Sequence, residues 1–265
     1  MKKTVHFVSG LPFSGSTLLC NLIAQHSDVY ATGTSGMHLI GFNGRQYFSS
    51  EEFKSLPDPR SGIDLYESFV RAGVDHCYEK ITNKPIVVDK CRAWVGHLDS
   101  LFSIFPDAKV IVPVRSAIGI LSSFEKKFRK NPHSIHPVEM ARPSDWTTPE
   151  KRAKAALENA PISTALERVL ASRRYADRLL YVHFDNLTSN PHREMARVWN
   201  YLEVKPPKHD FNNVQQSTNE IDVGFPFGTH IIRPKVAPVS DISSTLFNDQ
   251  FCNIINANFN WISEL

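Results

Sequence analysis

The segment HFVSGLPFSGSTLLCN, residues 6 to 21, joins an apolar run to a glycine-rich turn and an amphipathic pattern. Gly10 and Gly15 are separated by four residues and Thr17 follows two positions later, which is the spacing of a phosphate-binding P-loop. Ser16 stands where that motif has a lysine for the outer phosphates of a nucleoside triphosphate. The spacing therefore predicts a turn in which backbone amides and hydroxyl groups contact an anion without that lysine.

Hydroxyl donors and apolar anchors surround this turn. Gly15 lets the backbone approach a ligand closely, and hydroxyl groups come from Ser14, Ser16 and Thr17. The apolar residues that would anchor the following helix to a sheet are Leu18, Leu19, Leu22 and Ile23. An ordinary strand, turn and helix with a serine N-cap is the alternative. We favour phosphate binding because the strand, the two glycines and the helix occur together.

A second group of anion donors lies in FPDAKVIVPVRSAIGILSSFEKKFRKN, residues 105 to 131. Arg115 ends an apolar run at 110–114, and Ser123 and Lys127 fall on the polar face of the amphipathic pattern that follows. An arginine binds phosphate in a bidentate manner, so these three side chains predict a charge-assisted clamp. The alternative is a solvated basic helix end, because basic residues also favour a helix C-terminus.

Charged and titratable residues near a third apolar run, 86–89, are candidates for catalysis. Lys90 ends this run, and strand ends of open α/β sheets face a ligand crevice, although pairing with a carboxylate explains Lys90 equally well. His38 is the first candidate for a general base, with Asp89 and His97 as the others. His133 and His136 have HxxH spacing without a third obvious ligand, so we predict no metal site.

The remaining pattern alternates short apolar runs with longer helical ones. Strands are expected at 4–9, 86–89, 110–114 and 179–184, and helices at 16–25, 64–80, 96–104, 117–129, 150–175 and 192–202. This alternation predicts an α/β three-layer sandwich with a central, mostly parallel sheet. We expect one domain over 1–265. Segments at about 36–60, 130–149 and 205–240 would form loops or lids at the rim of the site.

Composition limits the class of protein. The chain has 265 residues, 42% of them apolar, and a net charge of +3, which is too mild to indicate nucleic-acid binding. No apolar stretch has the length of a signal peptide or approaches the roughly 20 residues of a membrane span. Four scattered cysteines without CxxC spacing suggest a reduced, cytoplasmic protein. Nothing in the sequence indicates the oligomeric state.

The two anion-binding segments together resemble the sulfotransferases that use 3′-phosphoadenosine-5′-phosphosulfate (PAPS). The loop is similar at residues 14–18, and the second motif is similar in placing Arg115 eight residues before Ser123. Further similarity lies in IVVDKCRAW, FPDAKVIVPVR, YVHFDNLTSNPHREMARVWNYLEV and HIIRPKV, and is closest to the bacterial and tyrosylprotein branches. The order and spacing of these segments make the combination specific.

The resemblance implies a P-loop-like fold, PAPS as the sulfuryl donor, its release as adenosine 3′,5′-bisphosphate (PAP), and no required metal. It implies a cofactor site at residues 13–18, with Arg115, Ser123 and Lys127 on the 3′-phosphate. Arg233 and Lys235 resemble basic residues that fold over the cofactor. Phe184 corresponds to an aromatic residue near the adenine, and a plain core position explains it equally well.

One departure from this family pattern bears on catalysis. Phe13 stands where the loop usually carries lysine or arginine, so Lys90 is the expected replacement for that cation. Sulfuryl transfer needs no magnesium bridging two phosphates, which explains why a Walker lysine is dispensable. The predicted function is sulfuryl transfer to a hydroxyl of a small molecule or peptide. The alternatives are a nucleoside-triphosphate-dependent kinase, with Asp89 holding magnesium, and a noncatalytic adenine-nucleotide-binding protein.

Overall fold

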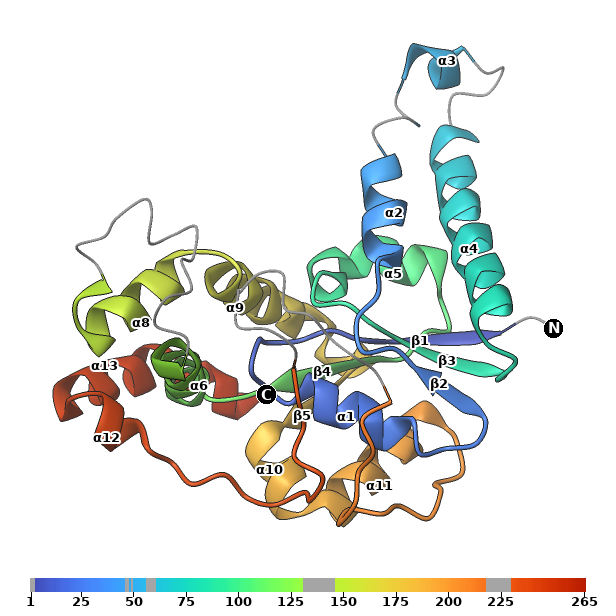
Figure 1. The fold of residues 1–265 in the computed structure, drawn as a ribbon. Coiled ribbons are helices and arrows are strands. Elements are labelled where there is room, and N and C mark those ends of the chain that lie inside the picture. Colours follow the sequence, from blue (N-terminus) through green and yellow to red (C-terminus); the bar gives the residue numbers. More distant parts are fainter. Residues whose placement is uncertain (1–2, 46–47, 49, 56–60, 131–145, 218–229) are drawn as a thin grey trace.

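The computed structural model describes residues 3–45, 48, 50–55, 61–130, 146–217 and 230–265. Five strands form one parallel sheet with the order β2-β3-β1-β4-β5 (Figure 1). They are β1 (Thr4–Val8), β2 (Val29–Ala31), β3 (Ile86–Lys90), β4 (Val110–Val114) and β5 (Leu179–His183). The predicted parallel α/β sheet is confirmed, and β2 is an edge strand that the prediction lacked.

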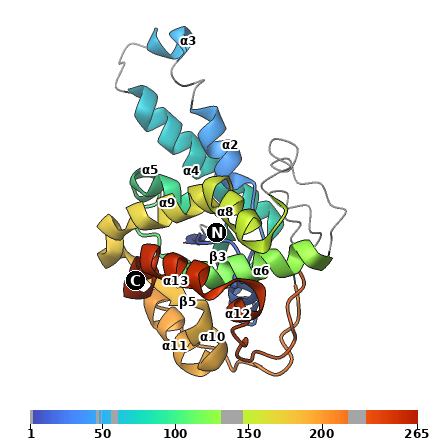
Figure 2. The same ribbon diagram turned by 90° about the vertical axis from the view of Figure 1, so that its left-hand side faces the viewer.

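Helices cover both faces of the sheet, so the predicted three-layer sandwich is confirmed (Figures 1 and 2). One apolar core is shared with α1 (Ser16–Ile23), α10 (Phe184–Ser189) and α11 (Pro191–Leu202). The other is shared with α4 (Ser61–Ile81), α5 (Leu98–Ile104), α6 (Ala117–Lys130), α8 (Pro149–Glu158), α9 (Ile162–Ser172) and α13 (Asp249–Asn258).

Alternation along each strand explains why the strand sequences are continuously apolar. Phe7 and Val87 belong to the core on the α4 side, whereas Val8 and Val88 belong to the core on the α1 side. A parallel strand buried on both faces needs apolar residues at consecutive positions. The same alternation directs the side chains of Asp89 and Lys90, the last two residues of β3, to opposite faces of the sheet.

Several helix boundaries differ from the prediction. The helix expected over 150–175 is divided into α8, α9 and the 3₁₀ helix η4 (Arg173–Arg178), with Pro161 in the break, where it removes a backbone donor. The expected loop at 36–60 contains α2 (Met37–Gly44) and α3 (Glu51–Lys54), which extend with α4 away from the sheet (Figure 1). The C-terminal elements were not predicted and are α12 (Ser243–Leu246), α13 and η5 (Asn260–Glu264).

The other two expected rim segments are partly described. In the segment 130–149, residues 131–145 lie outside the described residues, as do residues 218–229 of the segment 205–240. Residues 205–217 and 230–240 contain no helix or strand, as predicted. Among the helices of the described ranges, none has the combination of length and apolar character that crossing a membrane demands.

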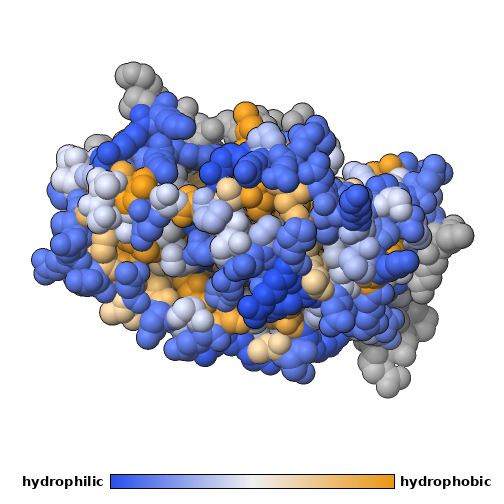
Figure 3. Space-filling view, turned by 90° about the horizontal axis from the view of Figure 1, so that it is seen from below, coloured by the Kyte–Doolittle hydropathy of each residue, from blue (hydrophilic) through white to orange (hydrophobic). Residues whose placement is uncertain are grey.

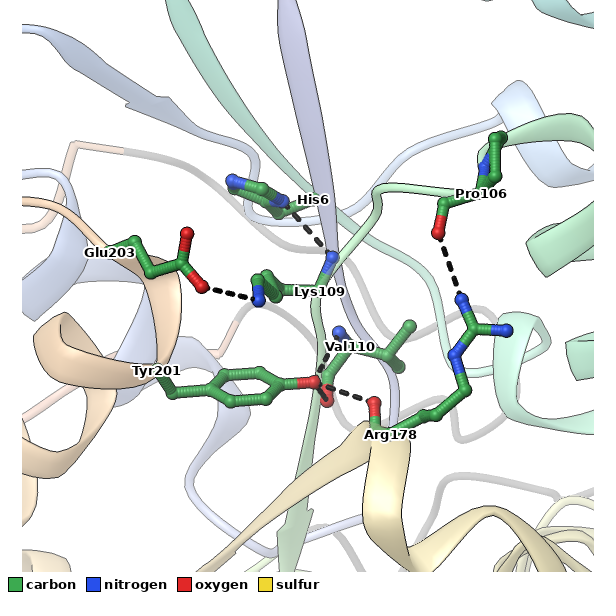
Figure 4. A network of polar contacts seen from close by, with 7 residues as sticks. All are labelled: His6, Pro106, Lys109, Val110, Arg178, Tyr201 and Glu203. Carbon is green, nitrogen blue, oxygen red and sulfur yellow. Dashed lines mark hydrogen bonds and ion pairs between the residues drawn. The ribbon is translucent and has the colours of Figure 1, made fainter.

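Polar contacts fix the amino ends of the strands on the edge opposite the glycine-rich turn (Figure 4). The Tyr201 hydroxyl of α11 donates to the Arg178 carbonyl at 2.7 Å and accepts from the Val110 amide at 3.0 Å. The Lys109 amide donates to Nδ1 of His6 at 3.1 Å, which joins the starts of β1 and β4. These contacts set the register of the strands, so that their carboxyl ends meet at one edge.

Candidate active site

The glycine-rich turn leaves the carboxyl end of β1 while still bonded to β4. The amides of Ser9 and Leu11 donate to the carbonyls of Ile111 and Pro113, each at 3.0 Å. Gly10 lies between them, where a Cβ atom would come within 2.2 Å of the Pro113 carbonyl oxygen. Glycine is therefore required at the start of the loop for close packing against β4 rather than for an unusual dihedral angle.

The second glycine serves a different purpose at the start of α1. Gly15 has φ of +78°, and a Cβ atom there would come within 2.5 Å of the Phe184 ring. Ser14 is buried and its hydroxyl donates to the Leu11 carbonyl at 2.5 Å, so this hydroxyl braces the loop and does not line the cavity described below. Gly15, the N-cap residue, has no side chain that could bond to the first amides of α1. The predicted use of these amides to bind an anion stays a prediction.

A cavity of about 480 Å³ lies in front of this turn. Most of the predicted cofactor residues line it, namely Phe13, Gly15, Ser16, Thr17, Leu18, Arg115, Ser123, Lys127, Phe184, Arg233 and Lys235. Among the described residues that line it, none is Asp or Glu. Its volume lies within the range of small-molecule sites, and its lining favours an anionic ligand.

Arg115 holds a fixed position on the β4 side of the cavity. Its Nη1 donates to the Phe13 carbonyl at 3.2 Å and to the Ser123 hydroxyl at 2.7 Å. Its guanidinium lies 4.3 Å from the centre of the Phe184 ring. Burial lowers the pKa of Arg115, and the Asp185 and Asp241 carboxylates oppose that shift. The structure thus brings the predicted pair of Arg115 and Ser123 together at one side of the cavity. Their role in binding an anion stays a prediction.

Phe184 begins α10 directly after β5 and is half-buried. It contacts both Gly15 of the loop and Arg115, so it is neither a strand residue nor a plain core residue. An aromatic ring beside the anion-binding groups is suited to contact a base or to exclude water. Its predicted role near the adenine stays a prediction.

Lys90 lies beneath the loop rather than in the cavity. Its side chain is 2% exposed, and Nζ is 3.4 Å from Oγ1 of Thr17, which does line the cavity. Its backbone amide donates to Oγ1 of Thr32 at 2.7 Å. Lys90 was predicted to face the ligand in place of the missing loop cation, but it is not among the residues that line the cavity and instead lies beside the Thr17 hydroxyl. Its role in catalysis stays a prediction.

Asp89 points to the opposite face of the sheet. Its carboxylate accepts hydrogen bonds from the Tyr78 hydroxyl and, at 2.7 Å, from Nε1 of Trp94, and it has no exposed surface. Burial raises the pKa of Asp89, and these hydrogen bonds act in the opposite direction. The carboxylate braces α4 against the turn after β3 and is not among the residues lining the cavity.

His38 lies in a buried aromatic cluster with Phe42, Trp94 and His97. Its ring stacks on Phe42 at 4.7 Å and meets Trp94 edge-on at 5.0 Å. Burial, aided by the charges of His97 and Arg168, lowers the pKa of His38 to about 4. The structure thus places a neutral imidazole at position 38, apart from the residues that line the cavity.

The segment containing Arg233 and Lys235 is held across the cavity by backbone contacts. Val236 donates to the Phe211 carbonyl and Val214 donates to the Pro234 carbonyl, both at 2.8 Å. Ser217, three residues after Val214, donates from its amide to Oδ1 of Asn21 in α1 at 2.7 Å. Arg233 and Lys235 lie in this segment and line the cavity. Their predicted position over the cofactor stays a prediction.

Four basic residues of the cavity were absent from the predicted site, namely Arg92, Lys126, Lys130 and His230. Lys126 and Lys130 had been assigned only to the basic end of a helix. Arg92 lies in the turn after β3, where strand alternation no longer applies, and it is positioned by hydrogen bonds from that turn to Val8 and Ser9. His230 follows a stretch without any periodic pattern.

Metal ligands do not gather in the described ranges, where no group of three or more His, Cys, Asp or Glu could hold an ion. His133 and His136 lie outside the described residues. The Asp89 carboxylate, which the kinase alternative assigns to magnesium, accepts hydrogen bonds from Tyr78 and Trp94.

The parallel sheet, the glycine-rich turn and the basic cavity define an α/β protein of the P-loop-like type with an anion site at its carboxyl edge. Residues 6–208 match the family model described as the sulfotransferase family. The chain therefore belongs to the sulfotransferase family, and the predicted membership is confirmed.

Similarity to individual proteins agrees with this membership. The chain is 26% identical over 222 residues to the nodulation protein NoeE of Sinorhizobium fredii. The aligned residues cover 80% of this chain and 52% of that protein. This chain thus spans about half the length of that curated relative. The sulfotransferase domain of the Synechococcus PCC 7002 olefin synthase is 18% identical over 98% of this chain and 96% of that one, with a TM-score of 0.53.

A third similar structure is retinol dehydratase in a complex with retinol and PAP, which is 14% identical over 100% of this chain and 81% of that one, with a TM-score of 0.51. At these identities the two solved structures support the fold. They carry no residue assignments to this chain.

Proposed function

We propose that this chain transfers a sulfuryl group from PAPS to a hydroxyl group of an acceptor. The observation that carries the proposal is the pair of Arg115 and Ser123, 2.7 Å apart, beside a lysine-free P-loop-like turn in one basic cavity. Two separated anion-binding regions fit a nucleotide that has a phosphate on each side of its ribose. Family membership and the PAP bound to retinol dehydratase give independent support.

The residues of the cavity suit such a ligand. The amides of Ser16 and Thr17 at the start of α1 would hold the 5′ end, and Arg115, Ser123 and Lys127 would hold the 3′-phosphate. Arg233 and Lys235 would cover it from the opposite wall. Bound PAPS supplies an activated sulfuryl group, and the chain contributes orientation and charge stabilisation, which need no metal ion.

The acceptor would bind next to the donor, outside the residues assigned to PAPS. We propose that α2 and α3, within the segment 36–60, shape an acceptor pocket for a small molecule or a peptide hydroxyl. Incubation with ³⁵S-labelled PAPS and pools of alcohols, sugars, lipids and tyrosine peptides, followed by mass spectrometry, would identify the class. A labelled product from none of these pools would favour the noncatalytic nucleotide-binding protein.

The cofactor assignment is tested by ligand preference. PAP should bind at least tenfold more tightly than AMP, because AMP has no 3′-phosphate for Arg115. Arg115→Ala should weaken PAP at least tenfold and leave AMP nearly unchanged in calorimetry. Tighter binding of Mg²⁺-ATP than of PAP, or equal losses for both adenine ligands in a folded variant, would support the kinase alternative instead.

A further inference from the structure

The loop itself contains no positive charge over residues 9–17, with the sequence SGLPFSGST. The Phe13 side chain, at the position just before Ser14 and Gly15, lines the cavity. Its ring centre is 6.5 Å from that of His230 and 6.0 Å from Nζ of Lys127. A cation for the 5′ end of the ligand must therefore come from another element.

Arg92 is held next to the start of the loop by the turn that contains it. The amide of Cys91 donates to the Val8 carbonyl at 3.1 Å, which extends the β1–β3 pairing by one residue. The amide of Val95 donates to the Ser9 hydroxyl at 2.8 Å. The turn 91–95 is thus tied to the two residues before Gly10, and Arg92 between these ties is half-buried and lines the cavity.

The two other basic residues near the loop have different positions. Lys90 is 2% exposed and lies beside the Thr17 hydroxyl, outside the set of residues that line the cavity. Arg115 is engaged by Ser123, the Phe13 carbonyl and the Phe184 ring on the β4 side. Arg92 and Arg115 therefore approach one loop from the strands on its two sides, β3 and β4. This arrangement suits two anionic groups on one ligand.

We propose that Arg92 contacts the 5′-phosphosulfate end of the donor and replaces the cation that position 13 lacks. The proposal deepens the proposed function and rests on it. In the transfer, the sulfur–oxygen bond to the 5′-phosphate breaks and its electron pair stays on that oxygen, which becomes a phosphate oxygen of PAP. A new bond joins the sulfur to the acceptor oxygen, whose proton passes to water. The Arg92 guanidinium stabilises the negative charge that develops on the departing oxygen.

Three nucleotides separate the roles of the two arginines without any need for turnover. PAP carries both phosphates, adenosine 3′-monophosphate carries only the 3′-phosphate, and AMP carries only the 5′-phosphate. Arg92→Gln should weaken PAP and AMP at least tenfold in calorimetry and adenosine 3′-monophosphate less than threefold, as expected for loss of one charge-assisted hydrogen bond. Arg193→Gln, which removes one charge at an exposed position of α11, should change none of the three affinities.

A second variant tests the replacement directly. Adding Phe13→Arg to Arg92→Gln should return at least a third of the lost PAP affinity and raise the single-turnover rate with PAPS. Equal losses for all three nucleotides, unchanged PAP binding in folded Arg92→Gln, or no recovery in the double variant would overturn the proposal. Failure of the proposed function would differ, because the unmodified chain would then not prefer PAP over AMP.

Discussion

The ends of β3 and β4 lie on either side of the loop and use charge in opposite ways. Arg115 directly follows β4, lines the cavity and contacts a hydroxyl, a carbonyl and an aromatic ring. β3 ends in Asp89 and Lys90, both nearly without exposed surface, on opposite faces of the sheet. The difference indicates that a charged residue at the end of a strand need not contact a ligand. Because side chains alternate between the two faces of a sheet, such a residue can be buried beneath the site.

Burial of Asp89 and Lys90 requires partners for each of them. Asp89 receives hydrogen bonds from Tyr78 and Trp94 on the α4 side, and Lys90 lies near Thr17 on the α1 side. An unpartnered charge would cost several kcal/mol in such positions. The end of β3 thus supports the loop and the turn that follows β3, while Arg92, two residues after Lys90, is half-buried and lines the cavity. Three changes test this division.

The largest expected effect is on Lys90. Lys90→Met should lower the single-turnover rate on the order of a hundredfold, because the amine supports the Thr17 hydroxyl and places charge beneath the loop. PAP affinity, measured by calorimetry, should fall much less. Lys154→Met, at an exposed position of α8, is the charge-matched control. An unchanged rate would remove Lys90 from the catalytic step and leave it a purely structural residue.

An intermediate effect is expected for Tyr78. Tyr78→Phe leaves Asp89 without one of its donors and should lower the free energy of unfolding by about 2 kcal/mol in urea titrations. PAP affinity should stay within twofold, since neither residue lines the cavity. Tyr66→Phe is the control, because within the described residues the buried Tyr66 hydroxyl has no hydrogen-bond partner. Lost PAP binding at unchanged stability would place Asp89 in the site after all.

The smallest expected effect is on the β4 side. Ser123→Ala removes the hydroxyl that orients Arg115 and should weaken PAP roughly fivefold, equivalent to about 1 kcal/mol. Ser122→Ala is an adjacent control, since the buried Ser122 hydroxyl has no hydrogen-bond partner in the described part of the chain. Similar affinities for the two variants would show that Arg115 keeps its position without Ser123.

The sequence was sufficient for the sheet because parallel strands buried on both faces are continuously apolar. It was not sufficient for the edge strand β2, whose three residues are too few for a periodic signal, or for α2, where Gly41 and Gly44 reduce the helical propensity. The division between α8 and α9 escaped prediction because the apolar spacing continues across Pro161. The proline itself was the signal for this break, because it lacks a backbone donor, and the hydrophobic period alone did not show it.

For the site, residues close together in the chain were easier to predict than those brought together by the sheet. The loop and the spacing from Arg115 to Ser123 are local patterns, so they were found. Arg92 depends on hydrogen bonds from its turn to Val8 and Ser9, more than 80 positions away. The difference between Lys90 beneath the loop and Arg92 in the cavity arises from that long-range pairing, which residue types alone do not reveal.

The close approach of Gly10 to Pro113 has a consequence for how this chain can change by mutation. Any side chain at position 10 would overlap the carbonyl and ring of Pro113, so most single substitutions there should be lost from a library selected for folded protein. Replacing Pro113 alone removes the ring, but the carbonyl that blocks position 10 belongs to the backbone. Single substitutions at the start of the loop should therefore be rare, and diversity between related chains should accumulate at positions such as 13 in the loop and 92 after β3, where one substitution can compensate for another.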